Sequence, residues 1–253
     1  MTWWHAVIIF VAGVWAGTIN AVVGSGTLVT FPVLVALGYP PITATTSNAV
    51  GLAPGTISGA YGYRAELEGY WPQIVKFSIA SFFGAIGGTV LLLTLPKDAF
   101  ETIVPVLVGL AVVLVIVQPT VSKWVQKRRD TNGTEHKPGP LLLGLLFVIG
   151  IYGGYFTAAQ GVMMMAVMGM LLSEPLQRLN GVKNVLAAVI NVVAGLIYAV
   201  VAPVSWPVIG LLAVGSTIGG QIGAKIGRKL PPTVLRAVIV VIGVAAVVEL
   251  VVK

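Results

Sequence analysis

Apolar stretches long enough to cross a lipid bilayer follow one another along almost the whole of this 253-residue chain. Hydrophobic residues make up 57% of the sequence and charged residues only 9%. A helix that spans the hydrocarbon needs about 20 predominantly apolar residues, and runs of this length exceed what a soluble core requires. The sequence therefore predicts an all-α polytopic membrane protein.

Ten membrane segments are predicted when proline, glycine and charge are taken as boundaries. They cover residues 3–20, 26–38, 42–62, 70–95, 98–118, 140–158, 162–172, 180–202, 206–227 and 232–252. The second and seventh are too short to span the hydrocarbon as ordinary helices. Each follows a polar break that contains glycine, so each either crosses as a short helix or forms a re-entrant hairpin with the segment before it.

Composition argues against several classes of function. The chain has no cysteine, and its two histidines, His5 and His136, are far apart in sequence. We therefore expect no metal and no cofactor, and no enzyme, because the sequence assembles no set of nucleophile, base and metal ligands. The net charge of +7 does not indicate nucleic acid, because the basic residues are not gathered on one soluble face with aromatic residues between them.

A polar linker divides the chain into halves of similar length. It reads SKWVQKRRDTNGTEHKPGP and gives a first repeat at 1–121, a linker at 122–140 and a second repeat at 141–253. Glycine and asparagine positions recur between the halves in the same order, displaced by 137 and then by 136 residues. The matched positions are Gly13, Gly17 and Gly24 with Gly150, Gly154 and Gly161, then Asn48, Gly55 and Gly59 with Asn184, Asn191 and Gly195. Later in the same order, at a displacement of 132, Gly87–Gly88 matches Gly219–Gly220.

The odd number of segments in each half predicts an inverted-topology repeat, because the second half then enters the membrane in the opposite orientation. Such repeats are typical of secondary transporters. With the linker in the cytoplasm, only Lys97 and Lys253 of the 15 lysines and arginines fall outside, as the positive-inside rule requires. We therefore expect a multi-pass protein of the cytoplasmic (inner) membrane with both termini outside.

Two polar breaks occupy equivalent places in the two halves. The first lies within NAVVGSGTLVTFP, residues 20–32, and the second within YFTAAQG, residues 155–161. Polar backbone at membrane depth is tolerated where it is buried in protein or lines a wet cavity. The N–H groups that begin the following helices carry the positive end of the helix dipole and would form an anion site. The alternative is that these small residues only let helices pack closely.

Two further helices carry polar side chains that should line the interior of the bundle. The residues are Thr46, Ser47 and Asn48 in segment 42–62, and Asn184 and Asn191 in segment 180–202. Serine and threonine hydroxyls in a helix are often satisfied by the helix backbone. A buried amide without partners is costly, so the asparagines indicate a polar site more strongly than the hydroxyls do.

The charged residues favour an anionic ligand. The eight carboxylates fall in predicted loops or near segment ends, which argues against a cationic substrate and against a buried carboxylate proton relay. Lys183 is expected about one turn inside its segment, where it either snorkels to the interface or supplies positive charge to an anion path. The candidate substrate-binding residues are Asn20, Gly24, Ser25, Gly26, Thr27, Thr46, Ser47, Asn48, Gln160, Gly161, Lys183, Asn184 and Asn191.

Two regions resemble the TauE/SafE sulfite-exporter family. GTINAVVGSGTLVTFPVLVALGYPPITATTSNAVG, residues 17–51, resembles its N-terminal signature, and GIYGGYFTAAQGVMMMAVMGML with NGVKNVLAAVINVVAG, residues 150–171 and 180–195, resembles its second repeat. The family commonly has a fuller glycine cluster at both breaks, where this chain has GSGT and QGVM. The resemblance implies an inner-membrane carrier for small sulfur-containing anions such as sulfite, thiosulfate, sulfoacetate or other sulfonates.

These observations together predict an exporter that moves a small sulfur oxyanion or sulfonate by alternating access around a midplane site. An anion channel would share the same polar axis but conduct without saturation, and a membrane scaffold that transports nothing is a further alternative. The partners expected are the substrate and the lipid bilayer, with no nucleic acid. The sequence leaves open the transport direction, the coupling ion and whether the protein forms a homodimer.

Overall fold

The computed structural model describes residues 2–132, 139–226, 240–241 and 244, and helices are the only regular secondary structure within them. The α-helices are α1 (Trp3–Val22), α2 (Thr27–Ala36), α3 (Pro41–Gly62), α4 (Trp71–Thr94), α5 (Lys97–Asn132), α6 (Pro140–Tyr155), α7 (Gln160–Leu171), α8 (Leu176–Val201) and α9 (Trp206–Ile226), and the 3-10 helix η1 covers Arg64–Leu67. The tenth predicted segment, 232–252, lies almost entirely outside the described residues.

Five of these helices are long and apolar enough to cross a membrane, namely α1, α4, α5, α8 and α9. The apolar helices α2, α6 and α7 have 10–17 residues, so the predicted shortness of the second and seventh segments is confirmed. Large apolar side chains are exposed on the outside of the bundle, for example Val200 at 83%, Val106 at 69% and Leu196 at 65%. Apolar surface of this kind is stable against lipid, so the fold is that of a polytopic membrane protein.

Two helix boundaries differ most from the sequence prediction. Helix α5 continues to Asn132 and so includes most of the stretch predicted to be a polar linker, because lysine, glutamine and arginine are good helix formers. Helix α8 begins at Leu176 rather than at residue 180, which places Lys183 two turns inside the helix. In the sequence prediction, charge ended the segment of α5 too early and began the segment of α8 too late, because a helix can continue beyond the membrane face.

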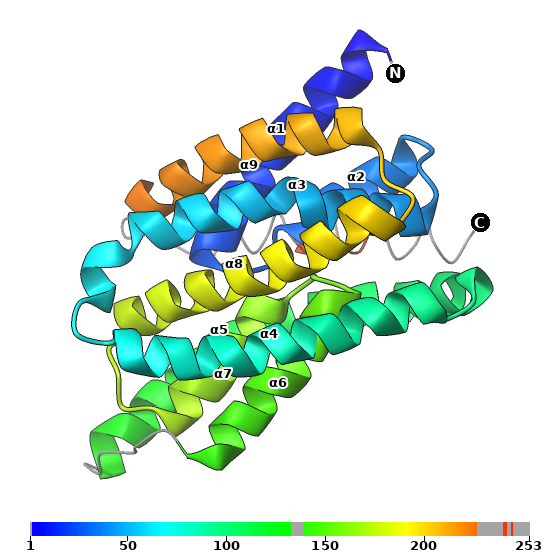
Figure 1. Ribbon diagram of the computed structural model, residues 1–253. Helices are drawn as coiled ribbons and strands as arrows, with labels where there is room; N and C mark the ends of the chain where they lie inside the picture. The colour runs from blue at the N-terminus through cyan, green and yellow to red at the C-terminus, as the bar shows by residue number, and fades with distance from the viewer. Residues whose placement is uncertain (1, 133–138, 227–239, 242–243, 245–253) are drawn as a thin grey trace.

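Four helices form a row through the middle of the molecule. Figure 1 shows α9, α3, α8 and α4 side by side, with α1 packed on α9 and α6 packed on α4. Glycines let these outer pairs approach closely: a Cβ atom on Gly84 or Gly88 of α4 would meet the backbone of α6, and one on Gly219 of α9 would meet the backbone of α1. Small residues serve the same purpose at many membrane helix interfaces.

The two predicted polar breaks are present as gaps between helices. The first covers residues 23–26, between α1 and α2, and the second covers residues 156–159, between α6 and α7. Gly24 has φ +91° in the first break, and Ala159 has φ 59° at the start of α7, both in the left-handed region that glycine adopts without strain. Each break therefore turns the chain sharply between a longer and a shorter helix.

Candidate functional site

The two breaks meet in the interior of the molecule at Gly24 and Gly161. The Gly161 N–H donates a hydrogen bond of 3.2 Å to the Gly24 carbonyl. A Cβ atom on either glycine would lie 2.6 Å from the Cα atom of the other, a separation that real side chains do not adopt. We call this contact, formed by residues 23–26 and 156–161, the junction.

Lys183 of α8 reaches the junction and is completely buried. Its Cδ atom would lie 3.3 Å and 3.1 Å from Cβ atoms placed on Gly24 and Gly161, so its stem packs against both glycines. Its ammonium donates to the Asn20 carbonyl at 2.9 Å and the Ala21 carbonyl at 3.1 Å. These carbonyls belong to the last turn of α1, where free carbonyls and the helix dipole favour a cation. Lys183 therefore does not snorkel to the surface.

Two asparagines of α8 hold the same end of α1. The Asn184 Nδ2 donates to the Ala21 carbonyl at 3.1 Å and to the Asn180 carbonyl at 3.0 Å. The Asn180 Nδ2 donates to the Ala21 carbonyl at 3.3 Å. Both amides are buried, so these bonds offset the cost of removing them from water.

A hydroxyl cluster of Thr27, Thr30, Asn48 and Thr157 lies beside the junction and is buried. The Thr27 and Thr157 hydroxyls are 2.8 Å apart and share a hydrogen bond. The Asn48 Nδ2 donates to Thr27 at 3.0 Å and to Thr157 at 3.5 Å, and its Oδ1 accepts from Thr30. The cluster thus connects α2, α3 and the second break through neutral groups.

The remaining polar groups of the breaks are partly engaged. The Gly26 N–H donates to the Asn20 Oδ1 at 2.6 Å, and the Gln160 Nε2 donates to the Asn191 Oδ1 at 3.3 Å. The Ser25 hydroxyl and the Gln160 Oε1 are buried and have no hydrogen-bond partner among the described residues. A buried polar atom without a partner is costly, so Ser25 marks a place where a ligand would be stabilising.

Most of the residues predicted for the site come together here. Ten of the thirteen lie in the junction, in the hydroxyl cluster or in direct contact with them. Asn184 shares the Ala21 carbonyl with Lys183, and the other two residues lie elsewhere. Thr46 donates to the Pro203 carbonyl at 2.8 Å, and Ser47 accepts from the Ser205 N–H at 2.8 Å. These two residues tie α3 to the connection between α8 and α9.

Two features of the site differ from what the sequence indicated. Thr30 and Thr157 are part of the hydroxyl cluster but were not among the predicted residues. The displacement of 137 residues that relates Gly24 to Gly161 also relates Asn20 to Thr157, so the predicted repeat pairs Thr157 with a residue of the predicted site. In addition, the N–H groups of Gly26 and Gly161 at the starts of the short helices are already bonded within the protein and are not free for a ligand.

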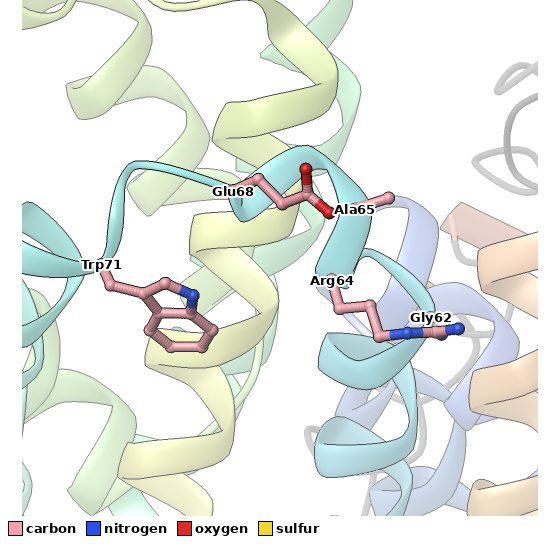
Figure 2. A pocket seen from close by; sticks show the side chains of 5 residues that line it. All are labelled: Gly62, Arg64, Ala65, Glu68 and Trp71. Carbon is pink, nitrogen blue, oxygen red and sulfur yellow. The ribbon is translucent and has the colours of Figure 1, made fainter.

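A separate pocket of about 540 Å³ opens at the surface between α3, η1 and α4. Figure 2 shows it lined by Gly62, Arg64, Ala65, Glu68 and Trp71. The Arg64 guanidinium stacks over the Tyr61 ring at 4.2 Å and donates to the Tyr61 carbonyl at 3.1 Å. Because its guanidinium is exposed and already engaged, and because Glu68 adds a negative charge, this pocket is a weaker candidate for an anion site than the junction.

The charges of the junction favour an anion. Lys183 is the one charged side chain that is buried among the described residues, and within them it has no carboxylate at ion-pair distance. No group of three or more histidine, cysteine, aspartate or glutamate residues that could hold a metal is found in the described part of the chain. The arrangement is a buried ammonium surrounded by amides, hydroxyls and backbone, which can bind negative charge.

Comparisons with known proteins support a transport role. The family model described as "Sulfite exporter TauE/SafE" matches residues 9–250. The "Probable membrane transporter protein YfcA" of Escherichia coli K12 is 29% identical over 156 residues, which cover 61% of this chain and 55% of that protein. The "Probable membrane transporter protein" of Haemophilus influenzae is 24% identical over 238 residues, which cover 93% of this chain and 90% of that protein.

A third relative, the "Probable membrane transporter protein ORF9" of a Sinorhizobium species, is 26% identical over 153 residues, which cover 60% of this chain and 56% of that protein. The chain thus matches little more than half the length of YfcA and of this protein. No solved structure gives a significant match. Because the family model covers almost the whole sequence, including both breaks and Lys183, the chain belongs to the sulfite exporter TauE/SafE family, a family of transporters and not of enzymes.

Proposed function

We propose that this protein is a secondary transporter that exports small sulfur-containing anions, such as sulfite, thiosulfate, sulfoacetate or other sulfonates. The anion binds at the junction and is released to the other side of the membrane by alternating access. The protein resides in the cytoplasmic membrane, with both termini outside and the linker 122–140 in the cytoplasm.

The observation that carries this proposal is the buried ammonium of Lys183 where the two breaks touch. A buried charge is costly unless it is paired, and in this protein its partners are two neutral carbonyls. A bound anion would complete the pairing. In membrane proteins an intramembrane charge that faces the bundle interior commonly belongs to a substrate pathway, and broken helices at mid-depth commonly form the substrate site of transporters.

The helix packing supports the inverted repeat on which alternating access depends. The pair formed by α1 and α9 corresponds to the pair formed by α6 and α4, and the contact of α3 with α9 corresponds to that of α8 with α4. Gly24 and Gly161, which are equivalent in the repeat, touch one another. An axis of approximate two-fold symmetry would therefore pass through the junction.

Reconstituted vesicles provide the test. We expect purified protein to catalyse counterflow of at least one sulfur oxyanion or sulfonate. We expect Lys183→Gln to reduce that flux by about tenfold to a hundredfold, because hydrogen bonds to charged groups contribute about 1.5–3 kcal/mol. Lys76→Gln is the matched control, since Lys76 of α4 is exposed and should leave flux unchanged. Absence of flux for every such anion would contradict the proposal.

An anion channel is the main alternative, because it would use the same polar groups. Saturable flux that is stimulated by substrate on the opposite side would identify a carrier, whereas flux that rises in proportion to concentration would identify a channel. A scaffold without transport would give neither result, and the anions would not raise its thermal stability.

A further inference from the structure

The surface pocket between α3, η1 and α4 is lined by one residue of each charge, Arg64 and Glu68 (Figure 2). We propose that this pocket binds the headgroup of a zwitterionic phospholipid with a primary amine, namely phosphatidylethanolamine. The phosphate lies against Arg64, and the ammonium lies against Glu68. The inference concerns a lipid that binds the transporter from the membrane, and it does not depend on which anion is carried.

The pocket lies where two long helices reach the same end of the bundle. Helix α3 ends at Gly62, and α4 begins at Trp71. Tyr61 and Trp71, at these two helix ends, are both exposed. Aromatic rings with a polar tip are enriched at the level of the lipid headgroups. The pocket is therefore expected at the membrane surface, within reach of a headgroup.

Exposed apolar side chains continue from the pocket along both helices. Ile57 lies one turn before Tyr61 on α3, and Val75 and Ile79 follow Trp71 at intervals of four residues on α4. Residues four apart share one face of a helix. Each helix thus offers an apolar stripe that begins beside the pocket. Such stripes suit the two acyl chains of a phospholipid and have no use for a soluble ligand.

Arg64 is positioned to bind a phosphate. Its guanidinium stacks over the Tyr61 ring at 4.2 Å, and its Nη1 donates to the Tyr61 carbonyl at 3.1 Å. A guanidinium has five N–H donors in a planar fork, so further donors remain for phosphate oxygens, which arginine binds in a bidentate manner. Stacking on the ring restricts the side chain before a ligand arrives, which lowers the entropy lost on binding.

Glu68 supplies the complementary charge. It directly follows η1 and is exposed, and no ion pair joins it to Arg64 in the described part of the chain, although both residues line the pocket. Two opposite charges that do not neutralise each other match a ligand that carries both. A wholly anionic headgroup would be repelled by Glu68, and a quaternary amine has no N–H to donate to its carboxylate.

The segment that carries both charges is fixed to α8. Leu67 of η1 is buried, and a Cβ atom on Gly181 of α8 would lie 2.8 Å from its Cδ2. The Arg178 Nε donates to the Glu66 carbonyl at 3.2 Å. The two charges are therefore presented by an anchored element, and the volume of about 540 Å³ is in the range of small-molecule sites.

Native mass spectrometry of the full chain tests the inference. Purified protein in detergent is equilibrated with equal amounts of phosphatidylethanolamine, phosphatidylglycerol and phosphatidylcholine, and the first bound lipid is identified by its mass. We expect phosphatidylethanolamine to exceed each of the other two by about fivefold, the upper range for one exposed charge pair. Free phosphorylethanolamine at the same concentration, which has both charges but no acyl chains, should not displace it.

Variants assign the binding to the pocket. Glu68→Gln should remove the preference over phosphatidylcholine, because the ammonium then lacks its carboxylate. Arg64→Gln should lower the fraction of protein with one bound phosphatidylethanolamine by about fivefold, and Arg64→Lys should restore part of it. Glu101→Gln is the control and should leave the preference unchanged, because Glu101 of α5 is also exposed but does not line the pocket.

Each contrary result has its own meaning. Equal binding of the three lipids, or a preference for phosphatidylglycerol, would overturn the match to a zwitterion. A preference that survives both Glu68→Gln and Arg64→Gln would place the lipid elsewhere and overturn the assignment to this pocket. Displacement by free phosphorylethanolamine would overturn the lipid as the occupant. Anion flux in vesicles is measured separately, so none of these results would contradict the proposed transport.

Discussion

Gly24 and Gly161 are in the tightest contact of the site, since each occupies the space where a side chain of the other would lie. Gly24 also has φ +91°, so a substitution there meets both steric and conformational resistance. The two effects can be separated because Gly38 has φ +88° but no atom within 4 Å of a Cβ placed on it.

We predict that Gly24→Ala lowers the free energy of unfolding by more than Gly38→Ala does. Backbone strain accounts for about 1–3 kcal/mol at either position, and overpacking adds about 1–3 kcal/mol at Gly24 alone. Thermal unfolding of the purified variants in detergent measures the difference. Equal losses for the two variants would mean that the breaks do not touch in the membrane.

The hydrogen bond between Thr27 and Thr157 joins the two halves of the chain. In a double-mutant cycle, Thr27→Val and Thr157→Val should therefore show a coupling energy of about 0.6 kcal/mol, a typical value for hydrogen bonds between membrane helices. Thr94 is the reference for the cycle, because it is exposed and bonds only within its own helix. Coupling of Thr27 with Thr94 should be close to zero, and equal coupling in both cycles would refute the contact.

Individual residues of the site were predictable where their chemistry is unusual for a membrane interior. Asn48, Asn184 and Lys183 stood out because amides and charges are costly there, and all three are buried at or beside the junction. Thr46 and Ser47 were grouped with them by position, yet they bond to the connection between α8 and α9. Sequence alone does not say which partner a hydroxyl finds, because that depends on tertiary contacts.

At the scale of helices, the glycines of α4 determine how closely α6 can approach. A Cβ atom on Gly88 would meet the Ile151 carbonyl oxygen and lie 2.8 Å from the Tyr155 nitrogen, whereas a Cβ atom on Gly87 would lie 3.6 Å from the Ile151 Cγ1. These adjacent glycines therefore form a matched pair, one at the interface and one beside it.

We predict that Gly88→Ala destabilises the protein by about 1–3 kcal/mol, because two backbones must move apart. Gly87→Ala should be neutral or slightly stabilising, since alanine favours a helix over glycine by about 1 kcal/mol. Chemical or thermal unfolding in detergent compares the two. A larger loss for Gly87→Ala would show that the contact between α4 and α6 is incorrectly placed.

The helices themselves were largely predictable, because hydropathy and the positions of proline and glycine identify apolar helices well. The least accurate boundaries were those of α5 and α8, where charged residues continue a helix past its apolar part. Arg178, for example, lies in the first turn of α8 and pairs with Glu174 at 2.7 Å. A charged residue therefore marks the end of the apolar part of a helix more reliably than the end of the helix.

At the scale of the whole molecule, the orientation in the membrane is a prediction from charge. The chain contains no natural cysteine, so single cysteines can be introduced without removing others. Asp98, at the start of α5, and Glu68, after η1, are both exposed and are expected on opposite sides of the membrane.

We predict that a membrane-impermeant maleimide labels Asp98→Cys in intact cells, whereas Glu68→Cys is labelled only after the membrane is opened. The reason is that the positive-inside rule places the connection between α3 and α4 in the cytoplasm and that between α4 and α5 outside. Labelling in lysed cells is the control for the reactivity of both cysteines. The opposite pattern would invert the proposed topology.

Spaced glycines predict an internal repeat, but they do not predict the way in which its two halves meet. Displacements of 137 and 136 residues identify equivalent positions, and they leave the contact between them open. Only the folded chain shows that Gly24 and Gly161 touch and that Lys183 packs on both. The contact arises from the crossing of helices from both halves, which no local pattern encodes.

The two proposed repeats correspond in outline but differ in charge. At the displacement that relates Asn48 to Asn184, the position of Lys183 corresponds to Ser47, so the cation has no counterpart in the first half. In a perfectly symmetric carrier the inward-facing and outward-facing states would be related by the two-fold axis and would have equal energies. A single lysine removes this degeneracy, so the concentration of anion needed for half-maximal flux should differ between the two sides of the membrane. The gradient of the anion still sets the direction of net transport. The unequal charge sets the apparent affinity for the anion on each side of the membrane.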